Sequence, residues 1–325
     1  MKLSKLIVLT LLSPVAMAST KSTVSFTLDN DGIFGVDQDY TNGIFLSYAT
    51  GQLKQESQWK WLSLADSEHA NIDKIELVLG HKMWTPSDIE ADYPLVNDRP
   101  YAGYLHTEIN YLSLTDDKAV RYNFTIGATG ESSLSEKAQE IVHGITGSTD
   151  PQGWDYQIDE KVAFSLGYRV FNKLMRSEEQ KTQWEITNIN DINAGNFRSD
   201  VSQGVMFRWG TNLASSIGAA NISVESPFSA SMLAQDTSSW FLFTGFEGRY
   251  RFNDMTIEGD RPDIPEPSAP YDVTLQNWQA SAVAGATWYN QNYGASLTFT
   301  IKTPDYEESQ TDVYGTGSFS VFAFF

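Results

Sequence analysis

The sequence has no cysteine, so disulfides do not hold its fold together and no thiol can act as a nucleophile. It has no run of about 20 consecutive apolar residues, which is what a membrane-spanning helix requires. Basic residues are scarce: 22 lysines and arginines stand against 41 aspartates and glutamates, and the formal net charge is −19. Because a chain this acidic repels nucleic acid, we expect no nucleic-acid partner.

Several catalytic signatures are also missing. The sequence contains no G-x-S-x-G elbow, no H-E-x-x-H zinc motif, no P-loop and no dinucleotide-binding fingerprint. Hydrolysis by this chain would need a water molecule activated by a histidine, with help from a cation or from fixed hydrogen-bond donors. The four histidines of the chain are His69, His81, His106 and His143.

The first residues have the pattern of a secretory signal peptide. Two lysines precede a short apolar run, which ends at Ala16-Met17-Ala18. A basic start, an apolar middle and an A-x-A end are typical of such peptides. We therefore expect residues 1–18 to be a signal peptide and residues 19–325 to form a single exported domain.

Beyond the signal, segments in which apolar and polar residues alternate recur along the whole chain, as in β-strands. A soluble sandwich would also alternate, but its outer face would be polar. An even number of antiparallel strands, with apolar stripes and aromatic residues at their ends, is typical of outer-membrane barrels. The sequence thus predicts an all-β fold, a twelve-stranded antiparallel transmembrane β-barrel in the cell outer membrane. The predicted strands are 22–29, 42–50, 74–84, 103–114, 119–129, 160–172, 181–191, 200–212, 239–252, 276–289, 292–303 and 312–325.

Two segments between the predicted strands stand out. Residues 131–146 have apolar residues at helical spacing, and Ser133 with Glu136 has the form of a capping box. We expect a short helix that lies over the extracellular mouth and carries His143. Residues 213–238 would connect two strands on the periplasmic side, where connections are normally short. The sequence does not place this segment.

The connection between the first two strands, 29–43, is rich in oxygen ligands. Such a set suits Ca²⁺ or another divalent cation, although the same residue types also form ordinary turns. If both termini are periplasmic, this connection and His143 lie on the same, outer side. Together they could activate water, although a lone histidine is often only a surface residue. We expect His69 at the surface, and one or both of His81 and His106 in a hydrated lumen. The oxygen-bearing residues of the connection are Asp29, Asn30, Asp31, Asp37, Asp39 and Thr41.

Six short motifs, in this order, give the chain a resemblance to the LpxR-type outer-membrane lipid A deacylases. The resemblance covers most of the chain from about residue 24, and it is weaker after residue 200. The motifs are Asn30-Asp31, Asp39-Tyr40-Thr41-Asn42-Gly43, Trp84-Thr85-Pro86-Ser87-Asp88, Asp98-Arg99-Pro100-Tyr101-Ala102-Gly103, His143-Gly144-Ile145-Thr146-Gly147 and Gly153-Trp154-Asp155-Tyr156-Gln157.

The resemblance implies a hydrolase that removes the 3′-linked acyloxyacyl group of lipid A and requires a divalent cation, usually Ca²⁺. It implies that His143 is the general base and that Thr41 orients its neighbours. Asn30 and Asp31 would hold the cation or position the water. It also implies that lipid A or lipopolysaccharide is the substrate and that membrane lipids surround the protein, which we expect to be a monomer. A supporting role falls to Tyr40, Asp98 and Arg99.

The resemblance is incomplete at one position. The related enzymes use a lysine of the second extracellular loop near the developing oxyanion, but between Lys82 and Lys118 this sequence offers only Arg99 as a cation. Two other readings therefore stay open. One is a non-catalytic barrel whose acidic mouth binds cations and lipopolysaccharide or admits small solutes. The other is a hydrolase that acts on glycerophospholipids.

Overall fold

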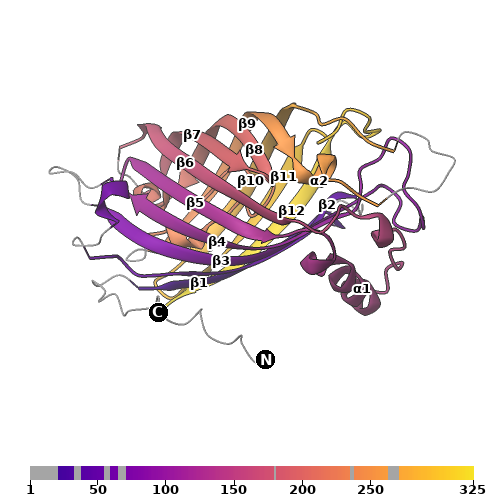
Figure 1. Ribbon diagram of the computed structural model, residues 1–325. Coiled ribbons are helices and arrows are strands. Elements are labelled where there is room, and N and C mark those ends of the chain that lie inside the picture. The colour runs from indigo at the N-terminus through magenta and orange to yellow at the C-terminus, as the bar shows by residue number, and fades with distance from the viewer. Residues whose placement is uncertain are drawn as a thin grey trace.

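Twelve strands form one closed antiparallel barrel, in which β1 pairs with both β2 and β12 (Figure 1). The computed structural model describes residues 21–32, 38–54, 59–64, 71–178, 181–234, 238–262 and 271–325. The predicted fold class is confirmed. The predicted signal peptide, residues 1–18, lies outside the described residues.

Each predicted strand segment overlaps one observed strand. The largest differences are at β6, which continues to Arg176, and at β7, which continues to Gly195 although the sequence predicts a loop over residues 191–199. Asp191 and Asn193 resemble turn formers in the sequence, but they face the polar lumen, where such side chains are compatible with a strand. The strands are β1 (Thr23–Asn30), β2 (Asp39–Ala49), β3 (Ile72–Thr85), β4 (Ala102–Leu114), β5 (Lys118–Ala128), β6 (Val162–Arg176), β7 (Gln183–Gly195), β8 (Arg198–Gly210), β9 (Ser239–Asp254), β10 (Trp278–Tyr289), β11 (Tyr293–Lys302) and β12 (Tyr314–Phe324).

Helices are few and short. Among the described residues, none is long and apolar enough to cross a membrane. The helical elements are η2 (Lys60–Leu62), η3 (Gly130–Ser133), α1 (Ser135–Thr146), η4 (Trp154–Tyr156), η5 (Leu213–Ser216), η6 (Ala230–Met232) and α2 (Met255–Glu258).

The alternation along each strand separates two environments. Outward-facing side chains are large and apolar, and Leu46 and Leu79 are 52% and 53% exposed on the outer wall. Inward-facing side chains around the polar part of the lumen, which Thr27 and Glu76 line, are mainly small, polar or charged. A wall that is apolar outside and polar inside is what a bilayer requires of a barrel.

The two rims of the barrel differ. One rim, which we call the loop rim, carries the connections 31–38, 86–101, 129–161, 196–197, 255–277 and 303–313. The opposite rim, the terminal rim, carries the first residue of β1 and the last of β12, together with the short connections 115–117 and 290–292.

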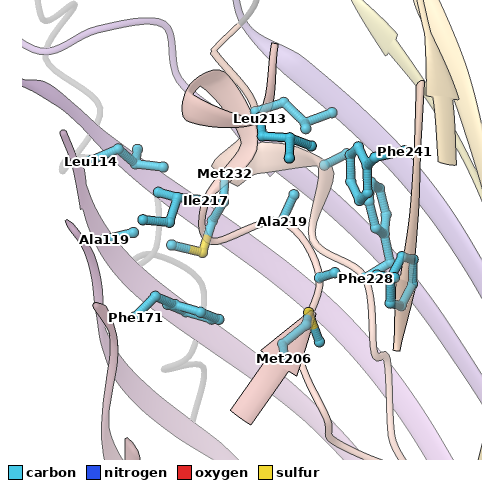
Figure 2. Close-up of a cluster of buried hydrophobic side chains, with 14 of the residues drawn as sticks. Leu114, Ala119, Phe171, Met206, Leu213, Ile217, Ala219, Phe228, Met232 and Phe241 are labelled. Atoms are coloured by element: carbon cyan, nitrogen blue, oxygen red, sulfur yellow. The ribbon is translucent and has the colours of Figure 1, made fainter. Parts of the chain in front are cut away.

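The connection from β8 to β9 leaves the terminal rim and folds back into the barrel, where its residues 211–234 form what we call the plug (Figure 2). Two buried cations of the wall hold the base of the plug. Lys74 Nζ donates to the carbonyl oxygens of Ser231 and Leu233 at 2.8 Å each, and Arg208 Nη1 donates to the carbonyl of Ser216 at 2.6 Å. The segment that the sequence does not place is therefore part of the interior.

Around the plug, the half of the lumen next to the terminal rim is a hydrophobic core of 21 buried residues. Figure 2 shows side chains of the plug, such as Ile217 and Met232, between those of the wall, such as Phe171 and Phe241. Between the plug and the loop rim lies a polar cavity of about 200 Å³. Seven basic and seven acidic residues line this cavity, so its charges balance.

Candidate functional site

The helix α1 begins after a tight turn. Residues Gly130–Ser133 form η3, and Leu134 adopts a left-handed conformation with φ of 60° at the N-cap. The predicted capping box is wrong, because Ser133 Oγ donates to the carbonyl of Gly130 at 2.6 Å and the N-cap residue makes no side-chain bond. The left-handed residue changes the direction of the chain, so that the helix runs beside the barrel.

The helix packs against the outer face of β3 and β4, and Figure 1 shows it outside the wall. A Cβ at Gly103, which faces outward on β4, would lie 2.1 Å from Ser135 Oγ, so only glycine allows this approach. Ser135 Oγ also lies 2.9 Å from Nε2 of His81, which faces outward on β3. The expectation that α1 covers the mouth is therefore wrong, and of the two strand histidines His81 faces away from the lumen.

An aromatic cluster fixes the following turn of α1. Trp154 of η4 packs on Tyr101 with ring centroids 4.6 Å apart, and Ala138 of α1 contacts the same cluster. The indole Nε1 of Trp154 donates to Oε1 of Gln139 at 2.8 Å. These contacts order the long connection between β5 and β6 and with it the next turn of the helix, which contains His143.

His143 is 6% exposed, and its ring is oriented by a backbone bond. Nδ1 is hydrogen-bonded to the carbonyl oxygen of Thr149. Because a carbonyl only accepts, Nδ1 carries the proton, and in the neutral ring Nε2 is then an acceptor. An imidazole in this tautomer can take a proton from water through Nε2.

Asn30 lies at the end of β1, on the outer face. It follows Leu28 by two residues on that face, and it is the cross-strand partner of Asn42 on β2. Asn30 Nδ2 donates to the carbonyl of Thr41 at 3.2 Å, and Asn30 Oδ1 accepts from Gly32 N at 2.8 Å. The side-chain amide has two hydrogens, so one bond to Thr41 leaves the second for another acceptor.

Asp31 and Thr41 complete the hairpin end. The backbone N–H of Asp31 donates to the carbonyl of Thr41 at 3.3 Å, and Gln38 N donates to Asp31 Oδ2 at 2.8 Å. The β2–β3 register shifts between Tyr40 and Asn42, so Thr41 occupies a bulge, and its hydroxyl lies 2.6 Å from that of Thr85. The bulge places both hydroxyls at the rim of the wall.

The structure thus brings Asn30, Asp31 and Thr41 together at one hairpin end. His143 lies at the same rim, on a helix that packs outside β3 and β4, the strands that follow β2 around the wall. These four predicted residues therefore share a rim, and Asn30 and the helix that carries His143 lie on the outer side of the wall.

Arg99 does not belong to this outer face. Its guanidinium is 1% exposed, is paired with Asp39, and lies 3.6 Å from Asp305 inside the loop rim. Burial works to raise the pKa of the Asp305 carboxyl, but Lys302, Arg251 and Arg99 outweigh it and hold that pKa well below its ordinary range. Because Arg99 is committed to these carboxylates, it cannot also neutralise an oxyanion outside the wall.

The other two supporting residues also have structural partners. Asp98 accepts hydrogen bonds from Ser87 N at 2.7 Å and from the hydroxyl of Tyr306 at 2.8 Å, which ties two loops together. The hydroxyl of Tyr40 donates to Asp29 Oδ2 at 2.8 Å inside the barrel. His106 faces the lumen as predicted, 3.2 Å from Glu108, while His69 lies outside the described residues.

The sequence reasoning missed Asn42 and Thr85 as site residues. Both lie in the motifs that carry the resemblance, but only the strand register shows that they face outward beside Asn30 and Thr41. Asn42 Nδ2 donates to the carbonyl of Asp29 at 3.1 Å. Asn42 Oδ1 is buried and has no hydrogen-bond partner among the described residues, so it is an oxygen that a ligand could use.

Hard oxygen atoms at the hairpin end fit a Ca²⁺ ion better than a transition metal. The described part of the chain contains no group of three or more His, Cys, Asp or Glu side chains placed to hold a metal. A cation here would therefore depend on one carboxylate, that of Asp31, together with the amide oxygens of Asn30 and Asn42 and with water or substrate.

Comparisons with known proteins agree with the fold. The family model described as outer membrane protein LpxR matches residues 5–325. The chain is similar to the solved structure of LpxR from Salmonella typhimurium, with 18% identity and a TM-score of 0.77 over 93% of this chain and 100% of that chain. The beta domain of the Bordetella autotransporter Brka has a TM-score of 0.43 and 7% identity, and covers 93% of this chain and 97% of that chain. A search of curated protein sequences finds no match.

Proposed function

Because the chain belongs to the LpxR family of outer membrane proteins, we propose that it is a lipid A deacylase, which removes the 3′-linked acyloxyacyl group in the outer leaflet. The reaction is the hydrolysis of a carboxylic ester. Water adds to the acyl carbonyl, and the sugar hydroxyl leaves with a proton. The reactive groups on this chain then have three tasks: to activate the water, to stabilise the oxyanion, and to admit a substrate from the membrane.

The direction in which the site faces carries this proposal. Asn30 lies two residues after Leu28 on the same face of β1, a rise of about 7 Å along the strand. Leu28 is 38% exposed on the apolar outer wall. A group in this position meets a molecule that lies in the bilayer beside the barrel. The acyl esters of a glycolipid lie at the same boundary between headgroup and hydrocarbon.

His143 acts as the general base. Its Nδ1–H bond to the Thr149 carbonyl keeps Nε2 free of a proton and fixes the plane of the ring. Nε2 takes a proton from the attacking water and returns it to the leaving sugar oxygen. General-base catalysis of this kind contributes roughly 10²- to 10⁴-fold to a rate.

Asn30 and Thr41 act on the developing oxyanion. The second hydrogen of Asn30 Nδ2 is available for the acyl oxygen while the first remains on the Thr41 carbonyl. The bulge at Thr41 fixes this geometry. A Ca²⁺ ion held by Asp31, Asn30 and Asn42 would supply positive charge to the oxyanion, which neither Lys82 nor Arg99 can reach from inside the barrel.

The alternative of a solute channel meets an obstacle in the plug. The lumen next to the terminal rim is filled by a hydrophobic core, and the charged residues of the remaining cavity are balanced. A non-catalytic lipid binder and a phospholipid hydrolase both remain as outcomes of the experiment. Lys82 and Arg99 pair with carboxylates inside the barrel, so neither is placed to bind the phosphates of lipid A or of a glycerophospholipid, and these two residues do not separate the substrates.

The deciding experiment combines the purified, folded protein with lipid A and, separately, with glycerophospholipid, in Ca²⁺ and in chelator. Mass spectrometry should show loss of one acyloxyacyl group from lipid A, and the loss should stop in chelator. Fatty acid released only from phospholipid would replace the substrate assignment. If both lipids stay intact with folded protein, the chain is a binder.

A further inference from the structure

The plug reaches from the terminal rim towards the loop rim and ends in a tight turn, residues 220–228, which we call the plug tip. Ala220 and Phe228 form an isolated antiparallel bridge, and Asn221 N donates to the carbonyl of Pro227 at 2.9 Å. Ser226 has a φ of 46°, a conformation that non-glycine residues seldom adopt. The structure thus holds a strained residue in place at the tip.

A two-sided ion pair clamps the plug tip. Glu225 Oε2 accepts from Lys82 Nζ of β3 at 2.8 Å, and Glu225 Oε1 pairs with Arg198 of β8. These two strands are five apart in the twelve-strand order, so they lie on different sides of the lumen. The clamp therefore fixes the tip against the wall from two directions.

Beside the clamp, the tip contacts the hairpin of the candidate site. Ser226 N donates to Asp29 Oδ2 at 2.8 Å, and the hydroxyl of Tyr40 donates to the same oxygen at 2.8 Å. Asp29 is fully buried and faces inward, while the next residue, Asn30, faces outward. The tip thus holds the inner face of the strand end whose outer face carries Asn30.

We propose that the plug tip is a positioning element for the site on the other side of the wall. Glu225 anchors the tip, the Ser226 N–H holds Asp29, and Asp29 fixes the ends of β1 and β2, so that Asn30 and Thr41 keep their places. The inference rests on the proposed function. Positions at a strand end tend to fray, and a displacement of about 1 Å in a catalytic group can cost roughly 100-fold in rate.

The test compares Glu225→Ala with Asp191→Ala. Asp191 is also an ion-pairing carboxylate of the same cavity, 2.7 Å from Arg169, but its partners lie on the wall and not on the plug tip. For Glu225→Ala we expect kcat on lipid A to fall at least tenfold, with KM within twofold, in protein whose heat-dependent gel shift shows a closed barrel. Asp191→Ala should leave kcat within twofold.

Hydrogen–deuterium exchange gives a readout that does not need turnover. Glu225→Ala should speed exchange of the Asp31 amide, which bonds to the Thr41 carbonyl, and Asp191→Ala should not. Unchanged exchange at Asp31, or faster exchange with an unchanged kcat, overturns the inference. If the wild-type protein leaves lipid A intact, the proposed function fails, and the exchange result alone decides whether the tip holds the hairpin.

A double mutant tests whether Glu225 and Asp29 affect kcat through one chain of contacts or independently of each other. Asp29→Ala removes the group that the tip holds, and combining it with Glu225→Ala should slow kcat little beyond Asp29→Ala alone. Groups that act through one chain of contacts give such non-additive effects. Fully multiplicative losses in the double mutant would contradict positioning through Asp29.

Discussion

Ser135 Oγ of α1 lies 2.9 Å from Nε2 of His81 on the outer wall of β3. This hydrogen bond joins the start of the helix to the barrel at the point where Gly103 leaves room for it. His143 lies two turns further along the same helix, so its place beside the wall depends on this attachment.

Ser135→Ala should weaken that attachment. A lost buried hydrogen bond costs about 1 kcal/mol, which corresponds to roughly a fivefold fall in deacylation if the helix must be docked for turnover. The measurement is the initial rate, together with protease cleavage within residues 129–161. Ser132→Ala, at an exposed position of the same turn, is the matched control. Equal rates for the two variants would contradict a role for this bond.

His143→Ala should reduce the rate of lipid A deacylation at least about 100-fold, because the general base is removed. Folding is checked by the heat-dependent shift in gel migration that closed barrels show. His106→Gln changes a lumenal histidine and should keep most of the activity. A His143→Ala variant that turns over at the wild-type rate would remove this residue from the mechanism.

Asn30→Asp keeps the size of the side chain but replaces its N–H donors by an acceptor. Loss of one oxyanion donor costs roughly 10²- to 10³-fold in kcat. We expect a fall of this size with little change in KM, measured at saturating Ca²⁺. A variant with normal kcat would show that Asn30 does not donate to the oxyanion.

Removing Ca²⁺ with a chelator should stop turnover, and added Ca²⁺ should restore it. In Asp31→Asn the carboxylate charge is lost, so the Ca²⁺ concentration for half-maximal rate should rise about tenfold or more, with rescue by excess Ca²⁺. Asp88→Asn, on an exposed loop, is the control and should titrate as the wild type. The ligand role of Asp31 fails if both variants show the same Ca²⁺ curve.

Because the plug and the wall fill the lumen next to the terminal rim with a hydrophobic core, we expect that the barrel does not conduct ions. In planar bilayers the wild-type protein should give no steady current. Replacing residues 213–236 by a short turn should open the lumen, since Thr211 N already bonds to the carbonyl of Trp240 at 2.9 Å and the strands meet there. Lys74→Met, which leaves two buried carbonyls unpaired, should lower stability without opening a pore. Equal conductance before and after the replacement would show that the plug does not seal the lumen.

The strands could be predicted from the sequence because the bilayer and the lumen impose opposite demands on alternate residues. Leu297 and Phe299 face outward and Thr298 and Thr300 face inward, as their period-2 pattern indicates. The barrel rim shared by Asn30 and His143 followed from counting strands, since every odd-numbered strand ends at the same rim.

The placement of α1 and of the plug could not be predicted in the same way. A helical period shows that α1 has a buried face, but not whether that face meets the lumen or the outer wall. That choice depends on Gly103 and His81, which are far from the helix in sequence. The plug has no regular period, because its carbonyls are paired within the plug and with Lys74 and Arg208 of the wall, and not with a neighbouring strand.

The plug also changes what the protein needs from its surroundings. In a barrel filled with water, the hydrogen bonds of the closed wall hold the ring together without an apolar core inside it. Here 21 buried residues meet inside the ring, where neither lipid nor detergent reaches them. We therefore expect this interior to stay packed when the protein is extracted into detergent, so that assays in mixed micelles act on a scaffold with its own internal support.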